Sequence, residues 1–298
     1  MTTEHGAEQL PTDRPPEGDD CRHCLDQGFV RLVETMGGDA AIVQAARVSY
    51  GKGTKSSRAD RGLIRYLMKH RHTTPFEMVE FKFHCRMPIF IARQWIRHRT
   101  ANVNEISGRY SIMEDRFWEP TADDMRTQST TNRQGSLDEK IAGDAAAMAA
   151  QFCADQRTLY AHYEAALAAG VAREIARVNL PLSLYTEWYW KIDLHNLLHF
   201  LALRLDAHAQ KEIRVFAEAM AFFVQRACPL AWESFEEFRL RGAEFSQSEL
   251  QLLRDVVQSN NLWPALQTAR TQQLQSDDAS PRLIEREIAE LSRKLMTP

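Results

Sequence analysis

The alternation of apolar and polar residues between Val79 and Met87 constrains the fold of this chain more than any other feature. In "VEFKFHCRM" the apolar side chains take every odd position, and the charged or imidazole side chains take every even one. Because successive side chains of a strand point to opposite faces, this repeat predicts a β-strand with one face in the core. Residues 183–193, "SLYTEWYWKID", alternate in the same way and predict a second strand of an antiparallel or mixed sheet.

Helical patterns surround the two strands. Apolar residues recur at intervals of three and four positions, an Ala-rich run ends at Gly170, and Pro88 suits the first turn of a helix. The polar, unpatterned residues 119–138 predict a long loop. The predicted helices cover residues 57–71, 88–99, 139–169, 172–180 and 194–229, the last as one long helix or two abutting ones. We therefore expect an α/β chain of the α+β type, with a central antiparallel or mixed sheet flanked by helices.

Composition divides the chain into three parts. Residues 1–27 are Pro-rich, acidic and polar, which predicts a disordered N-terminal extension. Residues 28–245 are expected to form one folded domain. Residues 246–298, with short helical patterns and few aromatic side chains, are expected to form a helical C-terminal extension.

The cysteines predict a cytoplasmic protein. Their number is odd and their spacing is scattered, which suits a reducing compartment better than a disulfide framework. Cys21 and Cys24 form a C-x-x-C, but no second pair follows at a distance that would complete a zinc site, so we predict no metal there. No apolar stretch is long enough to span a membrane, and the N-terminus lacks the pattern of a secretory signal.

Arg97, His98 and Arg99 crowd three cationic or titratable side chains into consecutive positions. Between residues 86 and 116 there are six arginines and three acidic residues, in a chain whose net charge is −3. Guanidinium groups bind oxyanions with a rigid fork of donors, so this cluster indicates a phosphate-bearing ligand. A solvated basic helix end is the alternative. Nucleic-acid binding is not expected, because the patch is short and the whole chain is acidic.

A second cationic group lies downstream. Arg173 and Arg177 are one helical turn apart, and Arg204 lies among leucines in a predicted helix. An arginine in apolar surroundings needs an anionic or polar partner, so Arg204 either contacts a ligand or pairs with Asp206 or Glu212.

His195 and His199 are four residues apart in "HNLLH", a spacing that can hold a metal ion from one helix face. Asn196 stands where the glutamate of an H-E-x-x-H motif would be, and His208 is the candidate third ligand. No carboxylate completes the set, so we expect these histidines to pack or to bind a ligand other than a metal.

The segment "RQWIRHRTANVNEISGRYS" resembles the signature of flavin-dependent thymidylate synthases, which is Arg-His-Arg followed by seven residues and a serine. The segments 72–99 and 172–214 resemble two further blocks of that family, and the likeness covers residues 40–240. There is one departure: residues 193–196 read Asp-Leu-His-Asn where some members read Asn-Ala-Arg-Ser, and His199 stands where other members can carry asparagine.

The resemblance implies a homotetramer whose FAD and dUMP sites lie between subunits. It also implies that dUMP is converted to dTMP, with methylenetetrahydrofolate as the one-carbon donor and FAD, reduced by NADPH, as the hydride source. The FAD contacts that it implies are His72, Thr74, Arg97, His98, Arg99, Asn104, Glu105, Asp193, His195, His199 and His208. The dUMP contacts that it implies are Gln94, Arg97, Glu105, Ile106, Ser107, Gly108, Arg109, Arg177 and Arg204.

Arg204 is the residue that we expect to activate the uracil ring in such a reaction. A fixed positive charge at N3 and O2 would stabilise the negative charge that develops there. No cysteine lies in a ligand-binding block beside a cation, and Ser107 has no base and orienting acid with it. Two other function classes stay open: a basic ligand-binding or RNA-interacting module without turnover, and a metal-dependent nucleotide hydrolase built on His195 and His199.

Overall fold

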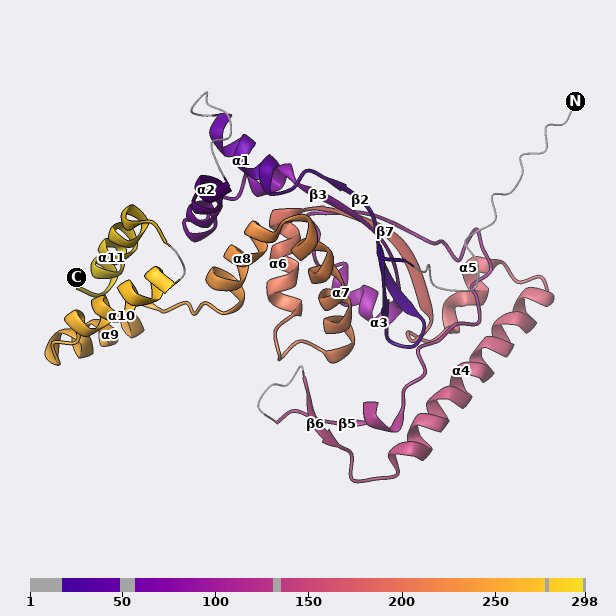
Figure 1. Cartoon of the computed structure of the whole chain (residues 1–298). Helices are drawn as coiled ribbons and strands as arrows, with labels where there is room; N and C mark the ends of the chain where they lie inside the picture. The colour runs from indigo at the N-terminus through magenta and orange to yellow at the C-terminus, as the bar shows by residue number, and fades with distance from the viewer. Residues whose placement is uncertain (1–17, 49–56, 131–134, 277–278, 297–298) are drawn as a thin grey trace, which may run out of the picture. The chain divides into compact units, whose positions relative to one another are not determined.

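The computed structural model describes residues 18–48, 57–130, 135–276 and 279–296 (Figure 1). The chain separates into two compact units, Met1–Phe235 and Glu236–Pro298, and each is described by itself. Of the described helices, none is both long enough and apolar enough to cross a membrane.

A five-stranded antiparallel sheet organises the first unit. Its strands lie in the order β1-β2-β3-β7-β4, so β3 and β7 pair at the centre over their full length, from Glu80 opposite Asp193 to Pro88 opposite Tyr185. Both strands expected from the alternating patterns are confirmed. The bounds are Cys21–Cys24 for β1, Gly28–Met36 for β2, Glu80–Pro88 for β3, Asn102–Glu105 for β4 and Tyr185–Asp193 for β7.

Helices and short 3-10 turns connect and cover these strands. Figure 1 shows α3, α6 and α7 on one side of the sheet and the long α4 at the periphery. The helices of this unit are α1 (Asp39–Arg47), α2 (Ser57–Lys69), α3 (Ile89–Trp95), α4 (Ala145–Ala168), α5 (Arg173–Ala176), α6 (Leu194–Arg204), α7 (Lys211–Ala227) and α8 (Pro229–Phe235). The 3-10 turns are η2 (Phe76–Met78), η3 (Ala122–Asp124) and η4 (Arg177–Asn179).

The core lies between the covered face of the sheet and these helices. Trp95, at the end of α3, is fully buried and meets Trp188 and Trp190 of β7 edge-on, with ring centroids 5.4 and 5.3 Å apart. The Trp95 ring also stacks on Phe200 of α6, with ring centroids 5.1 Å apart. Edge-to-face and offset aromatic pairs each contribute about 0.5–1.5 kcal/mol beyond area burial. This aromatic cluster therefore fixes α3 and α6 against β7.

On the opposite face of the sheet, polar side chains of β3 are buried, although the alternating pattern alone would place them toward solvent. His84 and Arg86 of β3 are buried, with exposed fractions of 2% and 5%. Glu187 of β7 accepts a hydrogen bond from His84 Nε2 at 2.5 Å and from Arg86 Nε at 2.8 Å. Burial raises the pKa of Glu187, but the bond from His84 and the charge of Arg86 outweigh it, so the net pKa is lowered.

Several predicted boundaries differ from the structure. Residues 21–24, predicted to lie in a disordered extension, form the edge strand β1, because pairing with β2 and burial of both cysteines outweigh the polar composition around them. Residues 1–17 of that extension lie outside the described part. The predicted helix 88–99 ends at Trp95, so the Arg-His-Arg cluster lies in the turn after the helix.

The region predicted as a loop and a following helix contains a hairpin. β5 (Arg126–Gln128) pairs with β6 (Ser136–Lys140), and α4 begins at Ala145, where the side chain of Asp144 accepts a hydrogen bond from Ala147 N. The polar stretch lacks the apolar alternation of a core strand because β6 is exposed throughout. Residues 194–229 form separate helices, α6, α7 and the beginning of α8, of which the first two agree with the two-helix alternative.

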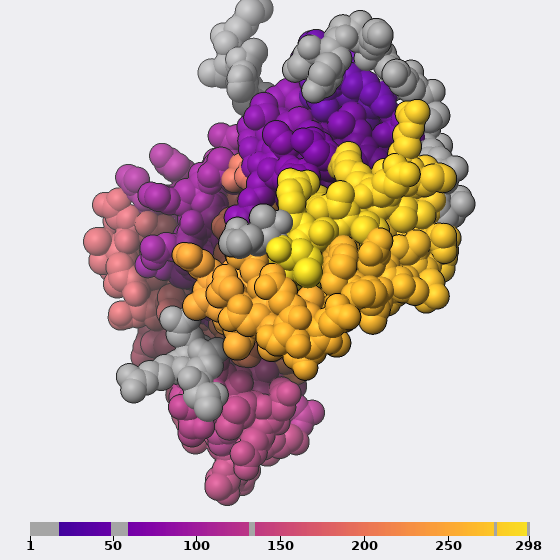
Figure 2. All heavy atoms as spheres, turned by 90° about the vertical axis from the view of Figure 1, so that its left-hand side faces the viewer, coloured from indigo at the N-terminus to yellow at the C-terminus, as the bar shows by residue number. Residues whose placement is uncertain are grey.

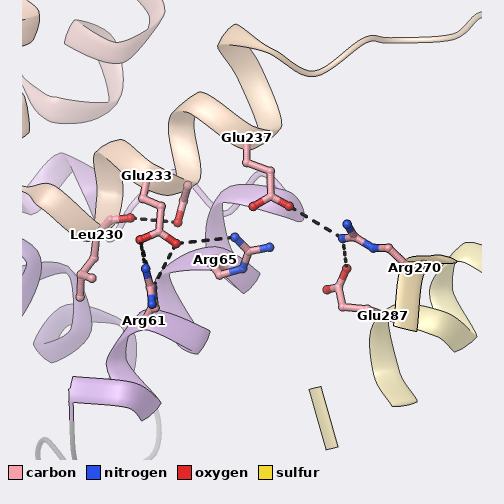
Figure 3. Close-up of polar contacts among 8 residues, drawn as sticks. Arg61, Arg65, Leu230, Glu233, Glu237, Arg270 and Glu287 are labelled. Carbon is pink, nitrogen blue, oxygen red and sulfur yellow. Dashed lines mark hydrogen bonds and ion pairs between the residues drawn. The ribbon is translucent and has the colours of Figure 1, made fainter. Parts of the chain in front are cut away.

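The second unit consists of a π-helical turn η5 (Glu236–Leu240) and α9 (Gln247–Ser259), α10 (Trp263–Ser276) and α11 (Pro281–Met296). Its atoms form one continuous body (Figure 2). Arg270 of α10 lies between two carboxylates of this unit, 3.5 Å from Glu287 and 3.9 Å from Glu237 (Figure 3). In residues 246–298, predicted to form a helical extension, the structure has α9, α10 and α11, and the unit begins at Glu236.

Within the first unit, ion pairs join the helix α2 to α8. Glu233 of α8 accepts two hydrogen bonds from Arg61 Nε, both 3.0 Å, and lies 3.9 Å from Arg65 (Figure 3). Arg61 and Glu233 are more than one third exposed, so solvent screens this pair strongly.

A buried ion pair holds the β5–β6 hairpin to the start of α7, and its loss should destabilise the first unit. Arg126 donates to Glu212, whose exposed fraction is 3%. The substitution Arg126→Met leaves a buried carboxylate without its partner, so we expect the free energy of unfolding in urea to fall by about 3–5 kcal/mol.

Lys140→Met is the matched control. Lys140 lies in β6 of the same hairpin, and its ion pair with Asp123 of η3 is exposed. The substitution should change the unfolding free energy little. The double variant Arg126→Met/Glu212→Leu should recover most of the lost stability. Equal stability of Arg126→Met and Lys140→Met would show that the pair does not hold the hairpin.

Candidate functional site

The ends of α3 and α6 bring together two of the predicted site residues, His98 and Arg204. After α3 ends, His98 N donates to the carbonyl of Trp95 at 3.0 Å, which turns the His98 ring toward α6. The ring meets Phe200 edge-on at 4.9 Å. Arg204, the last residue of α6, donates from Nε to His98 Nε2 at 3.2 Å. The partners suggested by the sequence, Asp206 and Glu212, bind other residues.

This hydrogen bond requires a neutral His98. Burial, then the charge of Arg204 and the nearby His199, lower the pKa of His98 to about 4. Nε2 can accept from Arg204 only when it carries no proton, so the proton of the neutral ring is on Nδ1. Burial also lowers the pKa of Arg204, which stays far above neutrality for a guanidinium and therefore remains charged.

A side-chain pair missed by the sequence analysis fixes the predicted dUMP residue Gln94. Its Nε2 donates to Gln210 Oε1, from the residue just before α7. This bond joins α3 to the segment between α6 and α7. Gln210 gives no signal in the sequence, because its role depends on a partner 116 positions away.

Strand β4 connects the predicted ligand residues to the buried polar network of the sheet. Glu105 accepts from the hydroxyl of the buried Thr186 at 2.5 Å, and Ile106 N donates to the carbonyl of Glu187 at 2.9 Å. Asn104 pairs with Tyr189 across the strands. Since Glu187 is held by His84 and Arg86, the register of this segment depends on that network.

Ser107, Gly108 and Arg109 form a tight turn after β4. The carbonyl of Ser107 accepts from the backbone of Tyr110 and Ser111 at 3.0 Å, and its hydroxyl accepts from Arg109 N at 3.3 Å. A Cβ on Gly108 would lie 2.8 Å from Met113 Sδ and 3.1 Å from Arg177 Cδ. Glycine therefore allows the side chain of Arg177 to approach this turn.

The arginines of the two cationic groups predicted from the sequence, together with Arg109 of this turn, differ in how they are engaged. Arg173 donates to the carbonyl of Tyr110 at 2.6 Å, and Arg109 lies 3.5 Å from Glu174. Arg97, Arg99 and Arg177 make no side-chain hydrogen bond or ion pair with any part of the chain that the structure describes. Such guanidinium groups are available to an anionic ligand.

The described contacts of His72, Thr74 and His208 are with residues other than His98 and Arg204. His72 is exposed, and its ring is 5.8 Å from that of Tyr66, while the carbonyl of Thr74 accepts from Glu77 N. His208 pairs with Asp206 at 2.8 Å.

Two predicted residues occupy the first turn of α6 or the position before it. Asp193 accepts the Asn196 amide at 3.0 Å as the N-cap of this helix, and the half-buried His195 lies in its first turn. Asp193 also lines a cavity of about 200 Å³ with Glu80, Thr100 and Asn102. His199 comes nearer the pair, with its ring 6.0 Å from that of His98.

No group of three histidine, cysteine or carboxylate side chains that could hold a metal ion occurs in residues 18–48, 57–130, 135–276 and 279–296. His195 and His199 thus lack a third ligand there. Burial raises the pKa of Cys85 well above its usual value and that of Cys228 to about 12, which disfavours a thiolate at these two positions.

The chain matches known proteins over most of its length. A family model described as "thymidylate synthase complementing protein" matches residues 31–230. The flavin-dependent thymidylate synthase of a Thermus thermophilus strain is 58% identical over 233 residues, which are 78% of this chain and 84% of that protein. The enzyme of the same name from Treponema denticola is 54% identical over 234 residues, covering 78% and 88% of the two chains.

A solved structure shows the same similarity in three dimensions. The UMP/dUMP methylase PolB from Streptomyces cacaoi, bound with 5-Br dUMP, superposes with a TM-score of 0.66 at 32% sequence identity. The alignment covers 74% of this chain and 99% of PolB.

The lowered pKa of His98 gives a test of the pair by nuclear magnetic resonance. The His98 ring should titrate at about pH 4, and replacing Arg204 by alanine should raise that pKa partway toward 6.5, since burial remains. Because the native state takes up this proton more weakly than the unfolded state, His98 adds stability above pH 6.5 that is lost as pH falls toward 4. Titration of His98 near 6.5 in the unmodified protein would contradict this geometry.

Proposed function

The chain belongs to the flavin-dependent thymidylate synthase family, and we propose that it converts dUMP to dTMP. In this reaction the methylene group of methylenetetrahydrofolate becomes attached to uracil C5, which loses its proton. A hydride that originates from NADPH completes the methyl group. The products are dTMP, tetrahydrofolate and NADP+, with net uptake of one proton.

The observation that carries the proposal is a set of unpaired guanidinium groups in a member of this family. Arg97, Arg99 and Arg177 have no partner among the described residues, and Arg177 approaches the turn at Ser107–Arg109, which presents backbone groups beside it. A nucleotide with its phosphate in this cluster would gain charge-assisted hydrogen bonds. Gln94, Glu105, Ile106 and Arg204 would contact its sugar and base.

The residues present also fit FAD. Two of the unpaired guanidinium groups, Arg97 and Arg99, suit its pyrophosphate, and the exposed edge of β4 offers Asn104 and Glu105 as a donor and an acceptor. His72, Thr74, Asp193, His195, His199 and His208 would complete the contacts. When bound, FAD supplies the hydride that completes the methyl group.

Arg204 would bind and polarise the uracil. Its Nε is held by His98, which leaves the two terminal nitrogens of the guanidinium free to donate to a carbonyl and a ring nitrogen. Negative charge that develops on O2 and N3 would meet a fixed positive charge, an effect worth about 3–4 kcal/mol per donor in oxyanion sites.

We also propose that the protein assembles as a homotetramer in the cytoplasm. Support comes from the separation of the FAD residues within one chain. His72 and Thr74 follow α2, whereas His98 and Arg204 lie at the ends of α3 and α6, and no hydrogen bond or ring contact of the described chain joins these two groups. Complete sites would then require residues from neighbouring chains.

The alternatives have less support. A metal-dependent hydrolase would need a third ligand beside His195 and His199, which the described chain does not supply.

Purified protein should be yellow, oxidise NADPH and form dTMP from dUMP and methylenetetrahydrofolate. A colourless protein that takes up no added FAD would instead favour a binding module without turnover.

The phosphate-binding role of Arg177 predicts a salt-sensitive loss of affinity. The substitution Arg177→Ala removes a charge-assisted hydrogen bond of about 1.5–3 kcal/mol, so the Kd for dUMP should rise about tenfold or more. The difference should shrink at high salt. Arg97→Ala should behave similarly, and Arg157→Ala, on the exposed surface of α4, is the control. Unchanged calorimetric affinity in both site variants would refute the assignment.

Catalysis by Arg204 rather than by a nucleophile predicts which variants keep turnover. Arg204→Ala should lose most dTMP formation per flavin while FAD still binds. Ser107→Ala should retain measurable turnover, because no base accompanies its hydroxyl in the described structure, and so should a variant without its five cysteines. A dead Ser107→Ala protein with normal dUMP binding, beside an active Arg204→Ala protein, would reverse the assignment.

A further inference from the structure

We propose that His98 is a positioning residue for Arg204, which holds the guanidinium in the orientation that binds the uracil. This inference rests on the proposed function, because it concerns the same dUMP site. The resemblance assigned His98 to FAD. In the structure, however, its Nε2 accepts the Arg204 Nε–H at 3.2 Å. The orientation of Arg204 is therefore set by a contact within the chain itself.

The geometry restricts both partners. The His98 ring is held by the backbone bond to Trp95 and by its edge-on contact with the fully buried Phe200. Arg204 lies at the end of α6, where four rotatable bonds would otherwise leave its guanidinium mobile. A single bond at Nε fixes the plane of the whole group, because the guanidinium is rigid and flat.

The net charge at the Arg204–His98 pair also depends on the protonation state of His98. A protonated imidazole could not accept this bond and would place a second positive charge beside Arg204. Arg204 and the exposed His199 are the titratable groups that lie against the ring. A neutral acceptor orients the cation without neutralising it, whereas a carboxylate in the same place would pair with the charge that the uracil needs. Histidine therefore preserves the electrostatic role of Arg204.

Two amide substitutions separate a hydrogen-bonding role from a packing role. The amide end of glutamine reaches the position of histidine Nε2, whereas that of asparagine reaches the position of Nδ1. His98→Gln should keep the acceptor for Arg204, and His98→Asn should lose it, although both remove the ring that packs on Phe200. His162→Gln, on the exposed surface of α4, controls for histidine substitution in general.

The measurement is dUMP affinity of the FAD-loaded protein by calorimetry in the absence of NADPH and methylenetetrahydrofolate, which needs no turnover. We expect His98→Asn and His98→Ala to raise the Kd about fivefold to tenfold, as for a lost hydrogen bond, and His98→Gln to stay within about twofold of the unmodified protein. The kcat of the FAD-loaded enzyme should fall in the same order. If the unmodified protein itself does not bind dUMP, the proposed function fails rather than this inference.

A double-mutant cycle tests whether His98 acts through Arg204. Lysine has no Nε–H at the position of the arginine Nε, so in an Arg204→Lys background the change His98→Ala should have no further effect on dUMP affinity. Additive effects of the two substitutions would overturn the proposal. So would equal losses in His98→Gln and His98→Asn, which would mean that the ring packs but does not position.

Discussion

The antiparallel pairing of β3 with β7 is the constraint on which the site depends. α3 begins directly after β3 and α6 directly after β7, so the two helices start at opposite ends of one paired ladder. The ladder spans about 27 Å at 3.4 Å per residue. The seven residues of α3 and the eleven of α6 span about 10 and about 16 Å. Helices that return over the same sheet face therefore finish near each other, which is where His98 meets Arg204.

Contacts on both faces of the β3–β7 ladder fix that arrangement. On the covered face, Trp95 packs against Trp188 and Trp190 of β7 and locks the end of α3 to the sheet. On the other face, Glu187 is satisfied by Arg86 directly opposite it and by His84 at the diagonal position. A slip of β7 by one residue would move every side chain to the wrong face and leave a buried charge without partners. The same residue accepts the backbone of Ile106, so register and the placement of the ligand turn are coupled.

The sequence predicts those parts of the fold that depend on local periodicity. β3 and β7 follow from their alternation, and the family blocks identify the residues that surround the site. Three features depend on distant partners and leave no local signal. β1 is polar in sequence but pairs with β2, the hairpin at 126–140 is held by Glu212 of α7, and Gln94 binds Gln210. The end of α3 at Trp95 also could not be read from the sequence, because the helical spacing of apolar residues continues through Ile96.

The crowding of Arg97, His98 and Arg99 now has a physical explanation. The C-terminal end of a helix carries partial negative charge from its unpaired carbonyl groups, and here the C-termini of α3 and α6 converge. This field favours cations, so Arg204 and the arginines that flank His98 are tolerated without carboxylate partners in the described part of the chain. A further positive charge on His98 would not be, and burial together with Arg204 lowers the pKa of His98 so that it stays neutral. The positive charge of the site thereby remains available to an anionic ligand, and the uncharged ring of His98 orients the guanidinium of Arg204.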